Sequence, residues 1–175
     1  MDALIFIVDT CLSLAVFAFL LRLLLQLSRA DFRNPLAQAV LRLTSWLVLP
    51  LRRVLPPAGR LDTASVVAVL LAQLARTSVV FWMSTGIAMP FLPLLQAAVV
   101  AAVVATLQLY TVAVIAYALL SLIAPGSYSP AVGLLATLCE PLLAPVRRVL
   151  PPLGGLDFSP LVVIVALQAI KLLVT

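Results

Sequence analysis

Residues 50–62 read PLRRVLPPAGRLD, and residues 145–157, which lie 95 positions further along, read PVRRVLPPLGGLD. Ten of these thirteen positions are identical. Each copy leads into a long apolar segment in which a glutamine and then a basic residue recur at the same offset: Gln73 and Arg76, then Gln168 and Lys171. Similarity at a fixed offset indicates an internal repeat. The sequence therefore predicts two tandem repeats, over residues 1–86 and 87–175.

The composition is typical of a membrane protein. Of the 175 residues, 65% are apolar and 10% are charged, and the mean hydropathy is +1.25. Soluble domains carry about 25% charged residues. Four apolar stretches come close to or exceed the length of about 20 residues that a membrane span needs: residues 3–27, 64–82, 96–123 and 158–174. We therefore expect an all-α membrane protein with four transmembrane helices, two in each repeat.

The basic residues predict how the chain is oriented. Six arginines lie between the first and second spans, Arg147 and Arg148 lie between the third and fourth, and the link between the second and third carries no charge. The positive-inside rule then places both arginine-bearing connections in the cytoplasm and both termini outside. Both repeats have the same orientation, as in parallel repeats related by an axis along the membrane normal. The rule also accounts for the net charge of +5, so no nucleic-acid partner is expected.

Each cytoplasmic connection is expected to contain a short amphipathic helix, over residues 35–49 and 130–143. Each helix begins with a capping residue followed by proline: Asn34-Pro35 and Ser129-Pro130. Such pairs are favoured at helix starts. Both helices are too short to span, so we expect them to lie in the cytoplasmic interface. Pro141 is expected to kink or shorten the second helix.

Two adjacent arginines in each copy of the motif lie close to the expected head-group level: Arg52, Arg53, Arg147 and Arg148. Guanidinium groups bind phosphate bidentately, and basic residues at this level attract anionic lipids. One interpretation is an orienting anchor with a stiff turn made by the Pro-Pro pair and the glycines. The other is a shared cytoplasmic surface for lipid phosphate or a partner protein.

An aspartate closes each motif, Asp62 in the first copy and Asp157 in the second. Each could cap the following span, where the helix dipole favours negative charge. In the second copy Ser159-Pro160 is a competing cap. Alternatively, each aspartate could pair with an arginine of its own motif or of the other copy.

Polar side chains within the spans form a second set of candidates, because such groups mark functional sites by default. The set consists of Asp9, Gln73, Arg76, Gln168 and Lys171. Asp9 and Arg76 could form a buried ion pair, or the Arg76 side chain could reach the head groups. For Lys171, and for Arg22 near the cytoplasmic end of the first span, we expect snorkelling to the membrane surface.

Motifs for catalysis are missing from the sequence. It contains no histidine, which is the commonest general base and metal ligand. The two cysteines, Cys11 and Cys139, form no CxxC pair, and no GxSxG, HExxH or phosphate-binding glycine loop is present. We therefore predict no catalytic residue, no metal or cofactor site and no enzymatic activity.

The complete pattern resembles the YggT family of small bacterial membrane proteins. It consists of an Asn-Pro start, a short amphipathic helix and RRxLPPxGGLDxSP before the last span. Residues 147–160 carry the motif closely, whereas the first copy departs from it at residues 58–60 and 63–65. The resemblance implies a location in the bacterial inner membrane. Plastid relatives are linked to haem attachment on a b-type cytochrome and to nucleoid distribution and division, which implies an assembly or scaffold role.

The predicted function is therefore that of a non-enzymatic assembly or scaffold factor. Its Arg-Arg/Pro-Pro segments would contact anionic head groups, a membrane-protein partner or a second copy of the chain. The alternative is a small transporter or channel subunit that works as an oligomer, with its path lined by polar side chains within the spans: Asp9, Gln73, Arg76 and Gln168.

Overall fold

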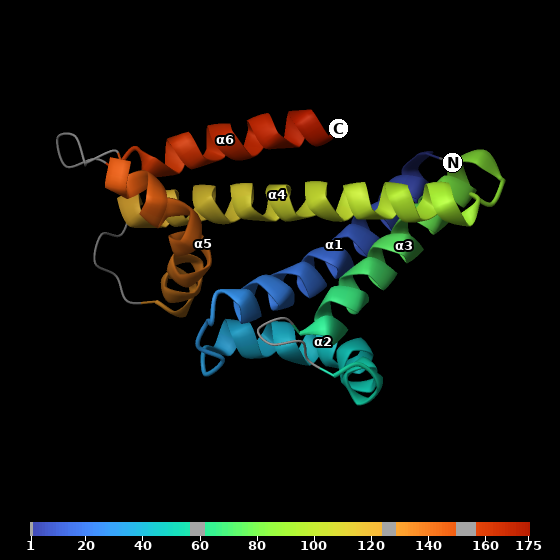
Figure 1. The fold of residues 1–175 in the computed structure, drawn as a ribbon, viewed down its shortest axis with the longest axis horizontal. Helices are drawn as coiled ribbons and strands as arrows, with labels where there is room; N and C mark the ends of the chain where they lie inside the picture. The colour runs from blue at the N-terminus through green and yellow to red at the C-terminus, as the bar shows by residue number, and fades with distance from the viewer. Residues whose placement is uncertain (1, 57–61, 124–128, 150–156) are drawn as a thin grey trace. The chain divides into compact units, whose positions relative to one another are not determined.

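The computed structural model describes residues 2–56, 62–123, 129–149 and 157–175. These residues form six α-helices and contain no strand (Figure 1): α1 Asp2–Leu27, α2 Pro35–Val54, α3 Thr63–Thr85, α4 Phe91–Ile123, α5 Pro130–Val149 and α6 Ser159–Val174. The predicted all-helical class is confirmed. The Pro-Pro turns and their glycines, predicted within residues 57–61 and 150–156, lie outside the described residues, although Pro56 lies within them.

Three of the described helices, α1, α3 and α4, are long and apolar enough to cross a membrane. The fourth predicted span corresponds to α6, which has 16 residues and is about 24 Å long at 1.5 Å per residue. A hydrocarbon core is about 30 Å thick, so the fourth span stays a prediction. With 33 residues, α4 is longer than a span needs and begins five residues before the predicted position. Pro93 is tolerated there because it lies in the first turn.

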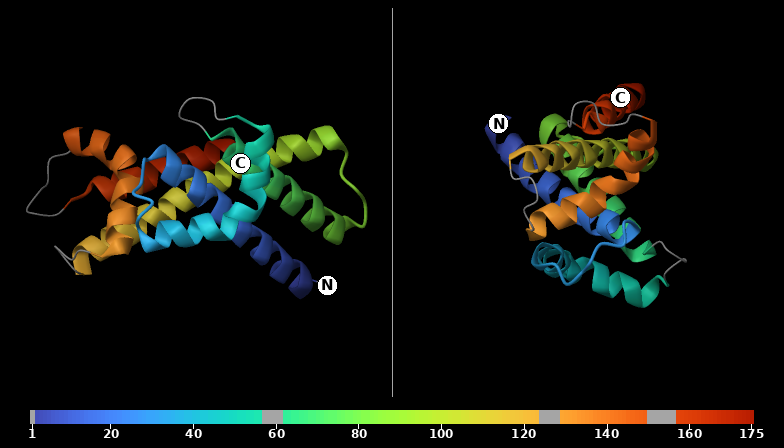
Figure 2. Two further views of the ribbon diagram at one scale, coloured as in Figure 1. Left: turned by 90° about the horizontal axis from the view of Figure 1, so that it is seen from below. Right: turned by 90° about the vertical axis from the view of Figure 1, so that its left-hand side faces the viewer.

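The chain divides into two compact units. The first contains Met1–Leu23 and Val40–Thr106. Within it, α1 and α3 lie side by side and run in opposite directions (Figures 1 and 2). Helix α3 is capped by Gly86, whose φ of 72° is left-handed and whose amide donates to the Trp82 carbonyl oxygen over 2.8 Å. Glycine suits this C-cap because it has no Cβ.

Small residues are prominent in the interior of the first unit beside the buried Phe19 and Leu20, and other large apolar side chains lie on its surface. Ala64, Ala68 and Ala98 are fully buried, while Phe6 and Leu14 are exposed. Small side chains allow helices to approach closely within a membrane. Lipid is as apolar as the exposed side chains, so this arrangement is compatible with a membrane protein.

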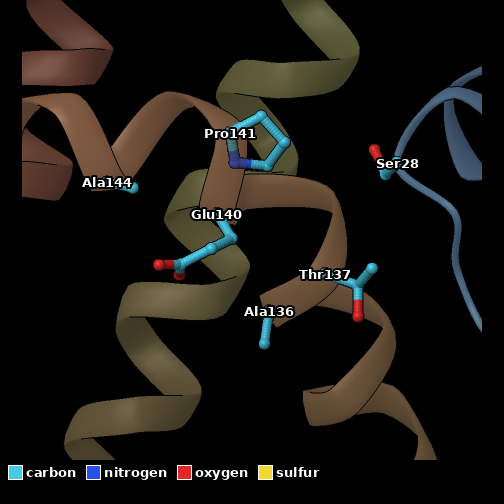
Figure 3. A pocket seen from close by; sticks show the side chains of 6 residues that line it. All are labelled: Ser28, Ala136, Thr137, Glu140, Pro141 and Ala144. Carbon is cyan, nitrogen blue, oxygen red and sulfur yellow. The ribbon is translucent and has the colours of Figure 1, made fainter.

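The second unit contains Leu24–Ala39 and Leu107–Thr175. In it, α6 runs alongside the second half of α4 (Figures 1 and 2), and the Gln168 amide donates to Thr111 Oγ1 over 3.3 Å. Helix α5 changes direction at Pro141 (Figure 3). The expected kink is therefore present, but the helix is not shortened.

Both connecting helices extend further than the sequence predicted. Helix α2 continues past residue 49, through Pro50, and helix α5, which already contains Pro141, continues past residue 143, through Pro145. An internal proline removes one backbone hydrogen bond and bends a helix without having to end it. The extension puts both Arg-Arg pairs in the last helical turn, where the helix dipole favours positive charge.

Candidate functional site

The first corner consists of Arg52, Arg53 and Asp62, between the end of α2 and the start of α3. The Arg52 guanidinium donates to Asp62 Oδ2 from Nη2 over 2.6 Å and from Nε over 3.1 Å. The same oxygen accepts a hydrogen bond from Ser65 Oγ over 2.7 Å. Asp62 occupies the N-cap position of α3 without a side-chain capping bond. Asp62 therefore pairs with an arginine of its own motif, which is one of the alternatives that the sequence left open.

The second corner consists of Arg147, Arg148 and Asp157, between α5 and α6. Arg147 Nε donates to Asp157 Oδ2 over 2.9 Å. Asp157 Oδ1 accepts the backbone N–H of Ser159 over 2.9 Å. The residue at the N-cap of α6 is Phe158, again without a side-chain capping bond. The same arginine–aspartate pair therefore closes both corners, with the two residues ten positions apart in each.

The second corner has two additional contacts. Arg147 Nη1 donates to Glu140 Oε2 over 3.1 Å, and the guanidinium carbon lies 6.0 Å from the centre of the Tyr117 ring. Glu140 also lines a pocket of about 550 Å³ beside the bend at Pro141 (Figure 3). The other side chains that line it, from Ser28, Ala136, Thr137 and Ala144, carry hydroxyls or methyl groups only.

The electrostatics of the second corner favour the charged aspartate. Partial burial raises the pKa of Asp157, but hydrogen bonds from Ser159 and from the Arg147 guanidinium outweigh this effect. The pKa of Asp157 is therefore held below its usual value, and the carboxylate stays ionised throughout the physiological pH range.

The structure gives different roles to the two arginines of each pair. Arg52 and Arg147 are neutralised by their aspartates. Arg53 and Arg148 are exposed, and neither forms an ion pair with any residue that the structure describes. The sequence grouped all four arginines together, whereas only the second of each pair lacks a carboxylate partner among the described residues.

The candidates within the spans include one ion pair. Arg76 of α3 donates from Nε to Asp9 Oδ1 over 2.8 Å and from Nη2 to Asp9 Oδ2 over 3.2 Å, and both side chains are partly buried. This bidentate contact is the first of the two alternatives that the sequence allowed. Gln73 is fully buried on the same helix. Lys171 lies in the last turn of α6.

Sequence reasoning was wrong about Arg22. Its side chain is only 2% exposed and does not reach the surface of the protein, as snorkelling would require. Nη1 donates to Thr44 Oγ1 of α2 over 2.9 Å and to the Leu41 carbonyl oxygen over 3.4 Å. The hydroxyl-bearing pair Thr44-Ser45 on the neighbouring helix was the available signal, because a buried guanidinium needs acceptors.

Among the residues that the structure describes, no three His, Cys, Asp or Glu side chains lie close enough together to hold a metal ion. The chemistry that the corners offer is ionic binding by exposed guanidinium groups.

Comparison with known proteins identifies relatives along almost the whole chain. The CCB3/YggT family model matches residues 1–83 and 96–175. The uncharacterized protein PA0392 of Pseudomonas aeruginosa is 43% identical over 173 residues, which cover 98% of this chain and 88% of that protein. The uncharacterized protein YggT of Escherichia coli K12 is 34% identical over 173 residues, covering 98% of this chain and 89% of its own length.

A further relative is an uncharacterized protein encoded in the proC 3′ region of Vibrio alginolyticus. It is 33% identical over 169 residues, covering 96% of this chain and 91% of that protein. No solved structure matches the chain. On the extent of these matches, the chain belongs to the CCB3/YggT family.

Proposed function

We propose that the chain is a non-enzymatic scaffold of the bacterial inner membrane. In this proposal it crosses the membrane four times as two parallel repeats, with both corners on the cytoplasmic side. Arg53 and Arg148 bind anionic lipid head groups or an anionic surface of a membrane-protein partner. The observation that carries the proposal is an ion pair that occurs in both corners. In each corner the first arginine pairs with an aspartate, and the second is exposed without such a partner among the described residues.

The arginine–aspartate ion pair explains why each motif has two arginines: one forms the pair and the other remains for binding. An arginine needed only for orientation does not require a fixed geometry, because the positive-inside rule depends on the number of nearby charges. The Arg52–Asp62 and Arg147–Asp157 pairs join the end of one helix to the start of the next. The neighbouring arginine then projects from a helix end of defined position. Each basic residue near an anionic surface contributes about 1 kcal/mol to binding.

Two observations support the repeated, four-span arrangement. The family model matches two stretches whose first residues, 1 and 96, are 95 positions apart, the same offset as that of the motif. Helix α6 is short for a span, but a short apolar segment can cross where the bilayer thins locally or flanking side chains reach the interface. Lys171 in its last turn is suited to such an anchor.

The experiment is lipid and partner retention in nanodiscs that contain equal amounts of phosphatidylglycerol and phosphatidylcholine. Arg53→Ala/Arg148→Ala is compared with Arg33→Ala/Arg42→Ala, which removes the same charge from exposed positions outside the corners. Native mass spectrometry should show fewer retained phosphatidylglycerol molecules, or the loss of a protein partner, in the corner variant only. Equal retention in both variants and in wild type would overturn the proposal.

A small transporter or channel subunit is the second candidate, favoured by the Asp9–Arg76 pair within α1 and α3. Groups of this kind within spans mark transport paths in other membrane proteins. The test is solute or ion flux in vesicles that contain the purified protein. Flux that Arg76→Leu abolishes would favour transport, whereas the absence of flux, or flux that the substitution leaves unchanged, would remove the proposed path.

A further inference from the structure

We propose that the Asp9–Arg76 pair forms one wall of a binding pocket for a small molecule without net charge that carries a hydrogen-bond donor next to an acceptor. A primary carboxamide is the simplest member of this class. Gln73 recognises the molecule. The inference does not depend on the corners, which lie elsewhere in the chain.

The pocket is in the first unit and has a volume of about 290 Å³. One face of α3 provides most of its wall, through residues spaced three or four apart: Gln73, Arg76, Thr77, Val80, Phe81 and Ser84. Such spacing places side chains on one side of a helix. Asp9 of α1 also lines the pocket. The volume lies just below the usual range for ligand sites, which begins at about 300 Å³, so the ligand has to be small.

The side chain of Gln73 points to the hydrogen-bonding pattern of the ligand. It is 0% exposed, and neither its Nε2 nor its Oε1 has a hydrogen-bond partner among the residues that the structure describes. Buried polar atoms are nearly always paired, so this amide requires a partner of another kind. The amide presents a donor and an acceptor side by side, and a second primary amide matches it with both groups.

Gln168 supports this interpretation as an internal comparison. It is the equivalent glutamine 95 residues later, and its amide donates to Thr111 Oγ1 over 3.3 Å. The second glutamine is therefore used in packing between α6 and α4. The first glutamine has no such partner and lines a pocket instead.

The charges in the wall exclude ions as the preferred ligand. Asp9 and Arg76 neutralise each other through two hydrogen bonds, so the wall carries no net charge. A wall without net charge gives an entering ion no net attraction to offset the cost of removing the ion from water. A dipolar molecule without net charge can contact both groups.

The lining also indicates where the ligand enters. The pocket extends from Gln73 to Ser84 and to Met89 in the α3–α4 connection. Eleven helical residues correspond to about 16 Å. The ligand therefore enters at the α3–α4 end and meets Gln73 at the deepest point.

The test uses ¹⁹F NMR of trifluoroacetamide with the full chain in nanodiscs, after subtraction of the signal from empty nanodiscs. N,N-Dimethyltrifluoroacetamide, which lacks the donor, and trifluoroacetate, which is charged, are the comparison probes. Wild type should broaden the trifluoroacetamide line, and both comparison probes should bind at least tenfold more weakly. Gln73→Leu should weaken trifluoroacetamide binding at least tenfold, whereas the matched Gln168→Leu should leave it unchanged.

Thermal unfolding of each variant checks its fold, and Gln73→Met, which has nearly the same shape as glutamine, replaces Gln73→Leu if the latter is unstable. Equal broadening in wild type and in a folded Gln73 variant would overturn the proposal. So would equal binding of trifluoroacetate, or no broadening by wild type, since the pocket would then hold only water.

Discussion

The two corners share an arginine–aspartate pair but differ in how that pair is surrounded. In the first corner, the Asp62 side chain is 13% exposed and also accepts a hydrogen bond from Ser65. In the second, Asp157 is 39% exposed, and Glu140 also binds Arg147. The identical positions of the motif determine which residues pair. The different flanking residues determine how much the pair is buried and whether a second carboxylate can replace the first.

The 95-residue offset also relates the helices that lead into the corners. Arg22 and Thr44 in the first copy correspond to Tyr117 and Cys139 in the second. The first pair forms a buried hydrogen bond of 2.9 Å. In the second copy, Cys139 is fully buried and the Tyr117 ring lies under the Arg147 guanidinium. The first copy therefore has a buried hydrogen bond between these two positions, whereas in the second the tyrosine contacts an arginine and the buried residue is a thiol.

Exchanging these residues should have the largest effect. Thr44→Cys removes the hydroxyl that accepts from the buried Arg22, and hydrogen bonds to charged groups contribute about 1.5–3 kcal/mol. We expect a loss of about 2 kcal/mol in the free energy of unfolding, measured by denaturation in detergent micelles. The reciprocal Cys139→Thr should cost less than about 1 kcal/mol, because a buried hydroxyl can bond to its own helix. Equal losses would contradict the assigned difference.

Removing the aspartates should have a smaller effect, and an unequal one. Asp62→Ala leaves Arg52 and Ser65 without their shared acceptor, and we expect a loss of about 1 kcal/mol, since Arg52 is partly exposed. Asp157→Ala should cost about 0.5 kcal/mol, because Glu140 still binds Arg147. Thermal unfolding of both variants in nanodiscs measures the difference.

Glu140→Ala sharpens this comparison. Combined with Asp157→Ala, it should cost more than the sum of the two single substitutions, because each carboxylate compensates for loss of the other. Glu140→Ala combined with Asp62→Ala should be additive, since Asp62 and Glu140 bind different arginines in different motifs. Additivity in both combinations would show that Glu140 does not compensate.

Some of these features follow from the sequence and others do not. The apolar stretches predicted helices, and the repeated spacing correctly included an Arg52–Asp62 pair among its alternatives. Periodicity did not predict that Arg22 would be buried, because its acceptors lie on another helix whose rotation depends on tertiary packing. Nor did it predict that α5 would continue through two prolines. The helix propensity of proline gives the free energy that each proline costs a helix, but not the stabilisation that arginines at the helix end provide.

Acid should weaken the second corner. The pKa of Asp157 is lowered in the folded protein from an unfolded value of about 3.9. A lowered carboxyl pKa stabilises the fold above the unfolded pKa, and the stabilisation disappears as the pH falls through the folded value. The stability difference between wild type and Asp157→Ala should therefore be constant from about pH 5 to 7 and decline below about pH 4. A difference that is unchanged down to pH 2 would contradict the ionic role of Asp157.

The last difference between the copies concerns reactivity, at the thiol that replaces Thr44 in the second copy. Burial raises the pKa of Cys139 to about 11, and only the thiolate reacts rapidly with alkylating reagents. At pH 8 about 0.1% of this thiol is ionised, compared with about a quarter of a thiol of pKa 8.5. In a Cys11→Ala background, N-ethylmaleimide should therefore modify Cys139 at least a hundredfold more slowly in the folded protein than after unfolding in detergent, as followed by intact mass.

Thr44→Cys/Cys139→Ala is the matched variant: its thiol lies beside the Arg22 guanidinium, which stabilises a thiolate, and should react faster than Cys139. Rapid and equal modification at both positions would show that the two helix contacts do not differ in polarity.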